Sequence, residues 1–379
     1  MKTDRSANGD MDVAGGNAWM RFWFTPTPTT GMQVLRVASG LLFCVWLLSF
    51  VGHQKELFSL NGWFDKKAYE QVVGRQREIE KAAREGKAQP QNLAPAPIGW
   101  SVLYLAGNSD EAFQVLYWAS VGVLVLFTLG IGTRVTGILT WVVVVSFLAK
   151  PATSYEADYL LGILAFYLML GHLFTGVWNG NRSFLGLVFG PCDQLVFSRA
   201  KGEPRLSYAA NFMMRMLQIH LAIIIVTSGL HKLQISDWWA GVALWYPLHP
   251  PFQTTAESVQ REAANAPTML FVLSAMGYAV LAWQLAFPFF AWRSGRVWRG
   301  LLLGGAAIGW VGETWLFKLP LFGPFVFIGC LSFLRPEDWA AAAKRLQGLV
   351  GSAGAAKSET AETEPAKVSI AVAKESIKK

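Results

Sequence analysis

The feature that most constrains this chain is a series of apolar windows that carry no charged residue. Each window is roughly 18–22 residues long, and a helix of about 20 apolar residues crosses the ~30 Å hydrocarbon core of a bilayer. Only 15% of the 379 residues are charged, against about 25% in soluble domains. We therefore predict an all-α fold, a polytopic integral membrane helical bundle.

The apolar segments predict about eight transmembrane helices. Their expected bounds are 32–51, 112–131, 135–149, 158–178, 211–230, 268–290, 300–317 and 321–334. Together they define a transmembrane domain over residues 31–338. Residues 1–30 are expected to form a disordered arm and residues 339–379 a polar, largely disordered tail, because such polar, simple segments cannot bury enough apolar surface to fold.

A long extramembrane loop, 52–111, is inserted after the first apolar segment. Its stretch 66–87, KKAYEQVVGRQREIEKAAREGK, is rich in charged residues that favour a helix. Few of its positions are apolar, so the pattern favours a helix exposed to solvent over a helix that binds the membrane surface. The loop is the candidate surface for a protein partner.

The chain has a net charge of +8. We interpret this positive charge as a signal that orients the protein in a membrane and not as a nucleic-acid-binding surface. There is no basic stripe with interleaved aromatic residues. The cations lie in short loops, at Arg134, within 179–210, and at Arg293, Arg296 and Arg299. The positive-inside rule then places both termini in the cytoplasm. We expect a multi-pass protein of a bacterial inner membrane whose main partner is the lipid bilayer.

Cysteine usage and short motifs exclude several functional classes. Cys44, Cys192 and Cys330 have no C-x-x-C spacing, so neither a disulfide framework nor a zinc site is expected. The phosphate-binding, dinucleotide, zinc-protease and serine-hydrolase motifs are missing from the sequence. We predict no metal site.

Lys232 is the most informative candidate residue, because it ends an apolar helix within the stretch 211–246. One interpretation is an anchor whose amine reaches the membrane interface. The other is an amine that desolvation turns into a general base. His231 is adjacent but points about 100° away on a helix, which makes it a weak candidate. Asp237 and Trp238 follow closely and could complete the site.

Other ionisable residues in or beside the apolar segments are candidates for a ligand cavity, since such residues are costly in a membrane and commonly functional. These are Arg36, Arg134, His220 and Glu313. His220 has no second ligand at helical spacing, which argues against haem or metal binding. Glu313 needs a partner, for which Lys318 and Arg36 are the candidates.

Two carboxylates, Glu156 and Asp158, precede the fourth apolar segment. One interpretation is a charged helix start, which the helix dipole favours. The other is that Glu156 or Asp158 pairs with Lys232 or Arg134 and takes part in catalysis.

The order of several short motifs resembles one membrane family. The motifs are L-R-V-A-S-G-L-L in the first segment, Thr133-Arg134-Val135, the run 159–166 (YLLGILAF), and S-G-L-H-K-L at 228–233 with Asp237-Trp238 and Gly241 behind it. In this order they resemble the horizontally transferred transmembrane (HTTM) proteins, the membrane part shared with vitamin K-dependent γ-carboxylase. The resemblance runs over about residues 30–250 and more weakly to about residue 338.

The resemblance implies a helical bundle with an outward-facing polar cavity and places Lys232 where the carboxylase has its catalytic base. By resemblance only, the ligand would be a reduced quinone of the vitamin K type. Ala157 stands where the carboxylase has a histidine, and the chain lacks the carboxylase's large lumenal portion. We therefore do not expect γ-carboxylation of protein glutamates itself.

Three functions remain open from the sequence. The first is an HTTM-type protein that binds a quinone-like or other lipophilic molecule around Lys232 and abstracts a proton as the carboxylase does. The second is a non-catalytic accessory or immunity-type membrane protein that binds a partner through loop 52–111. The third is a transporter of small molecules or ions with Glu313, His220 and Lys232 along its pathway.

Overall fold

The computed structural model describes residues 17–59, 62, 66–87, 100–106, 109–149, 157–175, 206–249, 254–342 and 345. The chain divides into two compact units, Met1–Phe333 and Leu334–Lys379. In the second unit residues 336–342 are helical, so the first residues of the tail predicted as largely disordered from residue 339 belong to a helix. The boundary lies a few residues before the predicted end of the transmembrane domain at residue 338.

Helices dominate the described part of the first unit. The long or apolar helices are α2 (Thr30–Leu48), α5 (Asp110–Leu129), α6 (Thr133–Leu148), α7 (Asp158–Phe174), α9 (Tyr208–Lys232), α12 (Pro267–Phe290), α13 (Arg296–Leu316) and α14 (Phe322–Leu331). Shorter or polar elements are α1 (Ala18–Phe24), α3 (Gln54–Phe58), α4 (Lys66–Arg84), η2 (Val102–Ala106), α10 (Ser236–Trp239), η4 (Tyr246–Leu248) and α11 (Ala256–Asn265). The two short strands, β1 (Thr27–Pro28) and β2 (Leu206–Ser207), pair antiparallel.

Each of the eight apolar segments predicted from the sequence contains one helix within its described residues, and the predicted helix at 66–87 corresponds to α4. Four helices, α2, α5, α9 and α12, are long and apolar enough to cross a membrane. α6, α7 and α14 are apolar but shorter. The all-α membrane fold is therefore confirmed at this level, whereas the number of spans remains a prediction.

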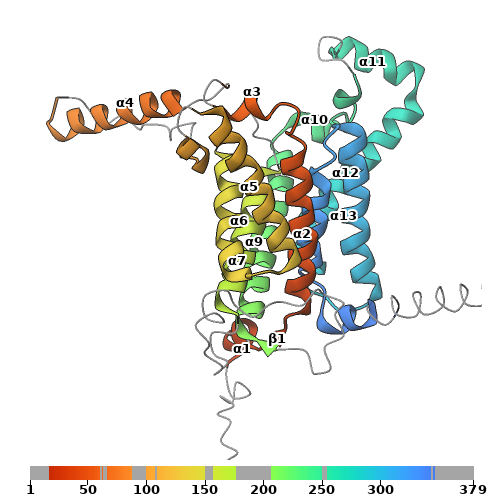
Figure 1. Ribbon diagram of the computed structural model, residues 1–379. Helices are drawn as coiled ribbons and strands as arrows, with labels where there is room; N and C mark the ends of the chain where they lie inside the picture. The colour runs from red at the N-terminus through yellow and green to blue at the C-terminus, as the bar shows by residue number, and fades with distance from the viewer. Residues whose placement is uncertain are drawn as a thin grey trace, which may run out of the picture. The chain divides into compact units, whose positions relative to one another are not determined.

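Consecutive apolar helices of the first unit run in alternating directions (Figure 1). α1, the α5–α6 turn and the beginning of α9 lie at one end, which we call the α1 end. The beginnings of α5 and α7, the end of α9 and α10 lie at the other, the α10 end. The α12–α13 turn belongs to the α1 end (Figure 1), and there Trp292 donates a hydrogen bond to Gln218 in the first half of α9.

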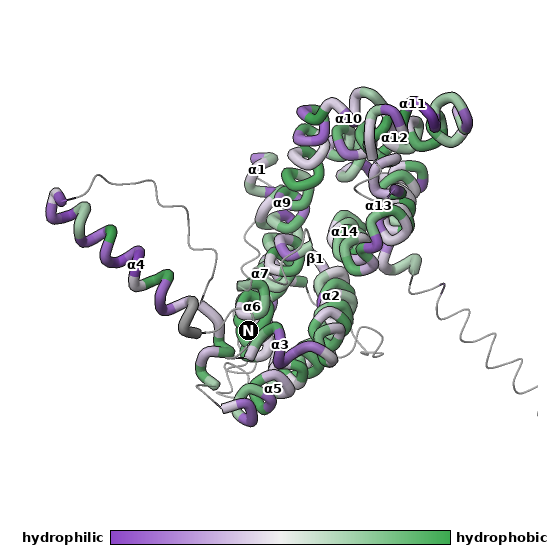
Figure 2. The backbone as a smooth tube through the Cα atoms, turned by 90° about the horizontal axis from the view of Figure 1, so that it is seen from above, coloured by the Kyte–Doolittle hydropathy of each residue, from purple (hydrophilic) through white to green (hydrophobic). Residues whose placement is uncertain are grey.

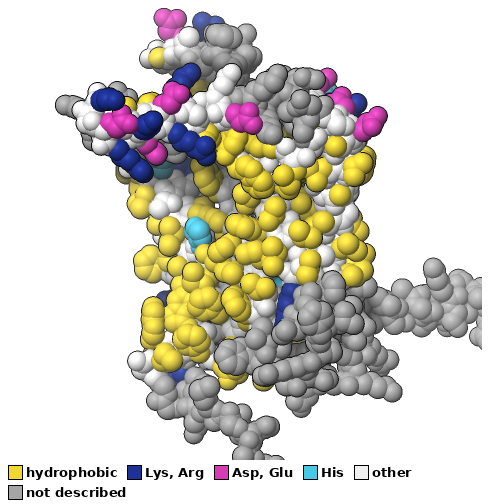
Figure 3. All heavy atoms as spheres, turned by 60° about the vertical axis from the view of Figure 1, so that its left-hand side comes forward, with side chains coloured by type: hydrophobic (Ala, Val, Ile, Leu, Met, Phe, Trp, Pro, Cys, Tyr) yellow, Lys and Arg dark blue, Asp and Glu magenta, His cyan; other side chains and the backbone are white. Residues whose placement is uncertain are grey.

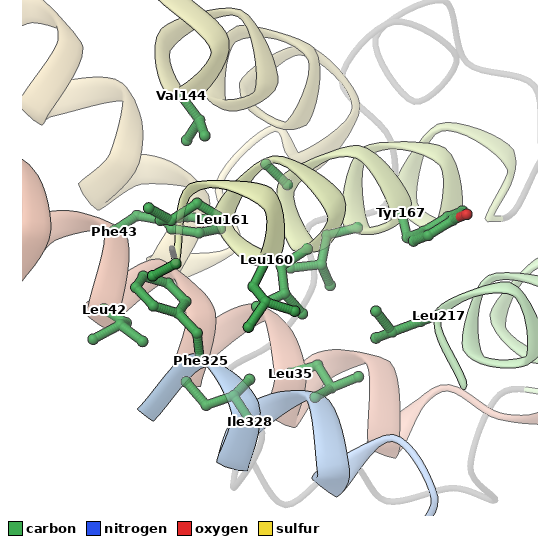
Figure 4. Packing of buried hydrophobic residues seen from close by; sticks show 14 of the residues in the cluster. Leu35, Leu42, Phe43, Val144, Leu160, Leu161, Tyr167, Leu217, Phe325 and Ile328 are labelled. Atoms are coloured by element: carbon green, nitrogen blue, oxygen red, sulfur yellow. The ribbon is translucent and has the colours of Figure 1, made fainter. Parts of the chain in front are cut away.

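The core forms where α2, α7, α9 and α14 meet (Figure 4). Leu35 and Phe43 of α2, Leu161 of α7 and Phe325 of α14 are fully buried. Phe43 and Phe325 stack with ring centroids 6.4 Å apart. A tightly packed interior of this kind fixes the level of each helix relative to its neighbours, which positions the residues at the two ends.

A broad apolar surface surrounds the helices. Figure 3 shows hydrophobic side chains over the middle of the molecule, with charged side chains gathered above them. Val115, Phe271 and Ile308 are 70%, 73% and 73% exposed. Contiguous apolar surface is rare on soluble monomers, so hydrocarbon is the environment that suits this surface. In Figure 2 the apolar helices are mostly green, while α4 is largely purple, as expected of a solvated helix.

The first described residues correct one expectation. Residues 17–28, predicted as part of a disordered arm, form α1 and β1. The Trp23 ring packs 5.6 Å from the Phe212 ring, and Asn211 donates to the carbonyls of Phe22 and Trp23 at 3.0 Å each. Aromatic burial and a capped helix end give this short segment a defined place. Residues 1–16 lie outside the described part of the chain.

Candidate functional site

Lys232 is the last residue of α9, and its amine is held in place. The Nζ atom donates to Ser228 Oγ at 2.8 Å, one helical turn earlier. The same atom lies 5.4 Å from the centre of the Trp238 ring. An ammonium group is attracted to the negative face of an indole ring. The side chain is half-buried, so it is neither an extended surface lysine nor a fully desolvated one.

A sharp turn brings Trp238 back over the end of α9. Gly241 has φ = +73°, a conformation that favours glycine. A Cβ at this position would also crowd Ser274 Oγ, at 2.7 Å. Ser274 donates to the Gly241 carbonyl at 2.7 Å, and Tyr278 donates to the Trp239 carbonyl at 2.8 Å. These bonds fix α10 on α12, so Trp238 meets Lys232 in a preformed arrangement.

His231 and Asp237, both expected near the lysine, play lesser parts among the described contacts. His231 is exposed, in keeping with its different direction on the helix. Asp237 is half-buried, and its main-chain carbonyl accepts from Val242 at 3.0 Å and from Ala243 at 3.1 Å. The aspartate therefore shapes the turn that carries Trp238.

Asp158 begins α7 at the same end as Lys232. Tyr167 of α7 and His220 of α9 share a 3.1 Å hydrogen bond, which fixes the relative level of the two helices. Asp158 lies nine residues, or about 13.5 Å, beyond Tyr167, and Lys232 lies twelve residues, or about 18 Å, beyond His220. The carboxylate, 8% exposed, is thus buried close to the level of Ser228. Glu156 lies outside the described residues.

His220 forms its hydrogen bond in the middle of the helices, away from both ends. Its ring also contacts the Tyr167 ring edge-on, with centroids 5.9 Å apart. Figure 4 shows the Tyr167 hydroxyl directed away from the apolar cluster. A polar pair of this kind satisfies two groups that would be costly in hydrocarbon. Among the described residues, no group of three His, Cys, Asp or Glu is arranged to hold a metal ion.

Arg36 lies at the α1 end and caps a neighbouring helix. Its Nη1 donates to the carbonyls of Phe127 at 2.8 Å and Thr128 at 2.9 Å, and its Nε donates to Gln33 at 2.9 Å. The side chain is fully buried. Carbonyls in the last turn of a helix lack internal partners, and a cation is favourable there. One helical turn further along α2, Gly40 lets α5 approach closely, since a Cβ would overlap Thr128 Oγ1.

Arg134, at the beginning of α6, repeats this arrangement. It is 6% exposed, and its Nη2 donates to the Thr175 carbonyl at 2.8 Å, where α7 ends. Asp158 lies at the opposite end of α7, seventeen residues or about 25 Å away. The pairing of Arg134 with Asp158, one of the alternatives that the sequence left open, is therefore wrong. Arg134 lies at the beginning of α6 and Asp158 begins α7, so the antiparallel course of these two helices places the residues at opposite ends of the bundle.

Glu313 lies near the end of α13 and is half-buried. Leu316, almost one turn later, packs with Leu244, Trp245 and Leu273 at the α10 end. Glu313 and Arg36 are therefore at opposite ends of the bundle, and the suggested pairing of these two side chains is wrong. The structure gathers Lys232, Asp158, Asp237, Trp238 and Glu313 in one half of the bundle and leaves Arg36 and Arg134 in the other.

Several polar residues that stabilise the structure were not predicted from the sequence. Ser228 holds the lysine, and its spacing of four from Lys232 was the available signal. Gln218 donates to the Ser332 carbonyl at 2.7 Å, where α14 ends. His172 is 1% exposed and lies 5.7 Å from the Phe127 ring. The sequence did not indicate the roles of these residues, because each lies in a long apolar run and one polar side chain hardly changes the mean hydropathy of such a segment.

Comparisons with models of protein families, with curated proteins and with solved structures found no match. The geometry of the site is therefore the basis for any function assigned to this chain.

Proposed function

We propose that this protein is a multi-pass membrane protein of the HTTM type that binds the polar head of a lipophilic, quinone-like molecule at Lys232. The observation that supports this proposal best is the position of the Lys232 amine at the end of an apolar helix. The amine donates a hydrogen bond to Ser228 and lies beside the Trp238 ring. A head group at this level would meet a hydrogen-bond donor and an aromatic face. The hydrocarbon tail would remain beside the apolar surface.

The residues present fit a quinone-like ring. Quinone oxygens accept hydrogen bonds, and an ammonium group offers three donors, so Lys232 can retain Ser228 and still bind a ligand oxygen. The Trp238 ring can pack against a flat ring as well as against the amine. The reaction that the resemblance implies is carboxylase-like proton abstraction, in which the neutral amine form of Lys232 would take a proton from the reduced quinone and become the ammonium form. The buried Asp158 at nearly the same level is the candidate group to balance charge there.

The test is mass spectrometry of lipophilic molecules that co-purify with the full-length protein. We expect a quinone-like species with wild type and its loss from Lys232→Ala. Lys55→Ala is the matched control, since Lys55 is an exposed lysine at the same end whose amine lies 4.0 Å from Asp110. Equal ligand content in wild type and Lys232→Ala would contradict the proposal. Each variant's thermal unfolding in detergent separates loss of the site from loss of the fold.

A role in partner binding is the second candidate, and α4 is the feature that favours it. The helix has 19 residues and a largely charged sequence. Its ring contact with the bundle joins Tyr69 and Tyr104, with centroids 5.3 Å apart. Deleting residues 66–87 should remove a protein that co-purifies while leaving the ligand of the Lys232 site bound. Recovery of the same protein after the deletion would contradict this second role.

A further inference from the structure

A tyrosine and a histidine meet halfway along the apolar helices. α9 runs from Tyr208 to Lys232 and is long and apolar enough to cross a membrane. His220 is its central residue, twelve positions or about 18 Å from either end. The hydrogen bond between its Nδ1 atom and the Tyr167 hydroxyl of α7 is 3.1 Å long. The pair therefore lies near the middle of the hydrocarbon layer.

The hydrogen bond within the pair uses only one of its two donors. A phenol has one O–H and a neutral imidazole has one N–H. If Tyr167 donates, the Nε2–H of His220 remains, and if Nδ1 of His220 donates, the O–H of Tyr167 remains. The described residues give neither side chain a second hydrogen bond. A donor without an acceptor is costly in hydrocarbon, so the pair suits a ligand that brings an acceptor.

His220 lies on the outward side of α9. The side chain is half-buried, and Ile223 and Thr227, three and seven residues later on the same helix face, are exposed. Leu221 and Ile225, which point in another direction, are buried. A molecule dissolved in the surrounding hydrocarbon can therefore reach the imidazole without entering the packed core.

Aromatic rings continue from this pair across two neighbouring helices. The His220 and Tyr167 ring centroids are 5.9 Å apart, and those of Tyr167 and Phe166 are 5.4 Å apart. Phe166 in turn contacts Trp141 of α6, with centroids 6.0 Å apart. Phe166 is 37% exposed, and Figure 4 shows the Tyr167 hydroxyl directed away from the apolar cluster. Flat rings pack favourably against aromatic side chains, so the surroundings of the pair suit a flat ligand.

The depth of the pair decides which molecules can supply the acceptor. The phosphates and ester carbonyls of lipids lie at the interfaces, about 15 Å from the middle of a ~30 Å hydrocarbon core. Water is excluded from that core. A molecule that dissolves in hydrocarbon and carries a carbonyl on a flat ring meets both requirements. Quinones belong to this chemical class.

We propose that Tyr167 and His220 form a second binding site, which holds a ring carbonyl of a quinone-like molecule that arrives through the hydrocarbon. The donor left over by the pair bonds to the carbonyl oxygen, and the ring packs beside Phe166. Lys232 is about 18 Å away along α9, so one ring cannot occupy both sites. The choice of a quinone-like ligand rests on the proposed function, whereas the position of the site rests on the Tyr167–His220 pair.

The test is photolabelling of the full chain in lipid nanodiscs with an aryl-azide derivative of menaquinone, followed by mass spectrometry of the labelled peptides. Wild type should be labelled in α7 and in the middle of α9. The double variant Tyr167→Phe, His220→Phe should be labelled there roughly 10-fold less at limiting probe concentration, because the hydrogen bond to the carbonyl is lost. It should still unfold near the wild-type temperature, since both partners are replaced by apolar rings of similar shape.

The single variants and a neighbouring control sharpen this test. Tyr167→Phe keeps the imidazole N–H and His220→Phe keeps the phenol O–H, so each should retain more label than the double variant. Thr227→Val is the matched control, because the Thr227 hydroxyl is exposed on the same face of α9 but already donates to the Ile223 carbonyl at 2.7 Å. This variant should be labelled as wild type.

Two outcomes would overturn the proposal. One is wild-type labelling of the double variant. The other is equal competition for the label by menaquinone and by a prenylated naphthalene that lacks carbonyls, which would show that the surface binds any apolar ring.

Lys232→Ala separates this site from the proposed function. The variant should lose label from residues 233–246 and keep it in the middle of α9. Label in the middle of α9 of wild type, with none near Lys232, would support the second site and contradict binding at the lysine. Label near Lys232 alone would contradict the second site and leave the proposed function standing.

Discussion

The Arg36 guanidinium donates a 2.8 Å hydrogen bond to the Phe127 carbonyl, so a fully buried cation on one apolar helix caps the end of the next. Arg134 does the same for the end of α7, and Gln218 does it for the end of α14. Water cannot satisfy main-chain carbonyls inside a bundle that hydrocarbon surrounds. At the α1 end, side chains of neighbouring helices donate hydrogen bonds to these main-chain carbonyls instead.

Replacing Arg36 with Gln should destabilise the protein. The shorter side chain cannot reach α5, which leaves two carbonyls without their charged donor, and hydrogen bonds to charged groups contribute about 1.5–3 kcal/mol each. We expect a loss of at least about 2 kcal/mol, seen as a lower midpoint of thermal unfolding in detergent. Arg21→Gln removes an exposed arginine from the same end and should change stability by less than about 0.5 kcal/mol. Equal midpoints for the two variants would show that the cap is not important.

Substituting Gly40 with Ala should separate α2 from α5. The new Cβ would overlap Thr128 Oγ1 and crowd the main chain of Thr128, and overpacking of this kind typically costs about 1–3 kcal/mol. Gly122→Ala is the control, because a Cβ at Gly122 meets nothing within 4 Å and alanine favours a helix. Unfolding midpoints in one detergent compare the two variants directly. An unchanged midpoint for Gly40→Ala would mean that the helices do not approach as closely as described.

Replacing Trp238 with Leu should weaken ligand binding at Lys232 without unfolding the protein. Packing of the indole against a flat ligand ring is worth about 0.5–1.5 kcal/mol, which corresponds to an affinity loss of roughly 2-fold to 13-fold. Trp239→Leu is the matched control, since Trp239 is 64% exposed and its indole donates to the Leu233 carbonyl. The measurement is the amount of quinone-like ligand retained after purification. A greater loss from the Trp239 variant would place the ligand away from Trp238.

The arginine-rich α1 end should face the cytoplasm, as the positive-inside rule requires. In a background without Cys44, Cys192 and Cys330, a single cysteine at Glu111 tests the α10 end and one at Ser294 tests the α1 end. A membrane-impermeant maleimide should label the first in intact cells and the second only after permeabilisation. The reverse pattern would invert the orientation and place Lys232 on the cytoplasmic side.

The sequence by itself determined the helical membrane class and the approximate bounds of the apolar helices, because length, hydropathy and charge are local properties of the chain. It also singled out Lys232, through a cation placed at the end of an apolar run. It did not determine what each buried polar group contacts. A pair of Arg134 with Asp158 was one alternative from the sequence, yet the antiparallel packing of α6 and α7 places the two residues about 25 Å apart.

Only the tertiary structure decided which carbonyls Arg36 and Gln218 cap and that Trp238 lies beside Lys232, since these contacts join residues from different helices or from beyond a turn. Hydropathy does not encode the level at which two helices pack, whereas interlocking side chains and close contacts at glycines such as Gly40 do. The same packing collects arginines scattered between positions 21 and 299 at one end of the bundle. Their common position follows from the alternating directions of the helices.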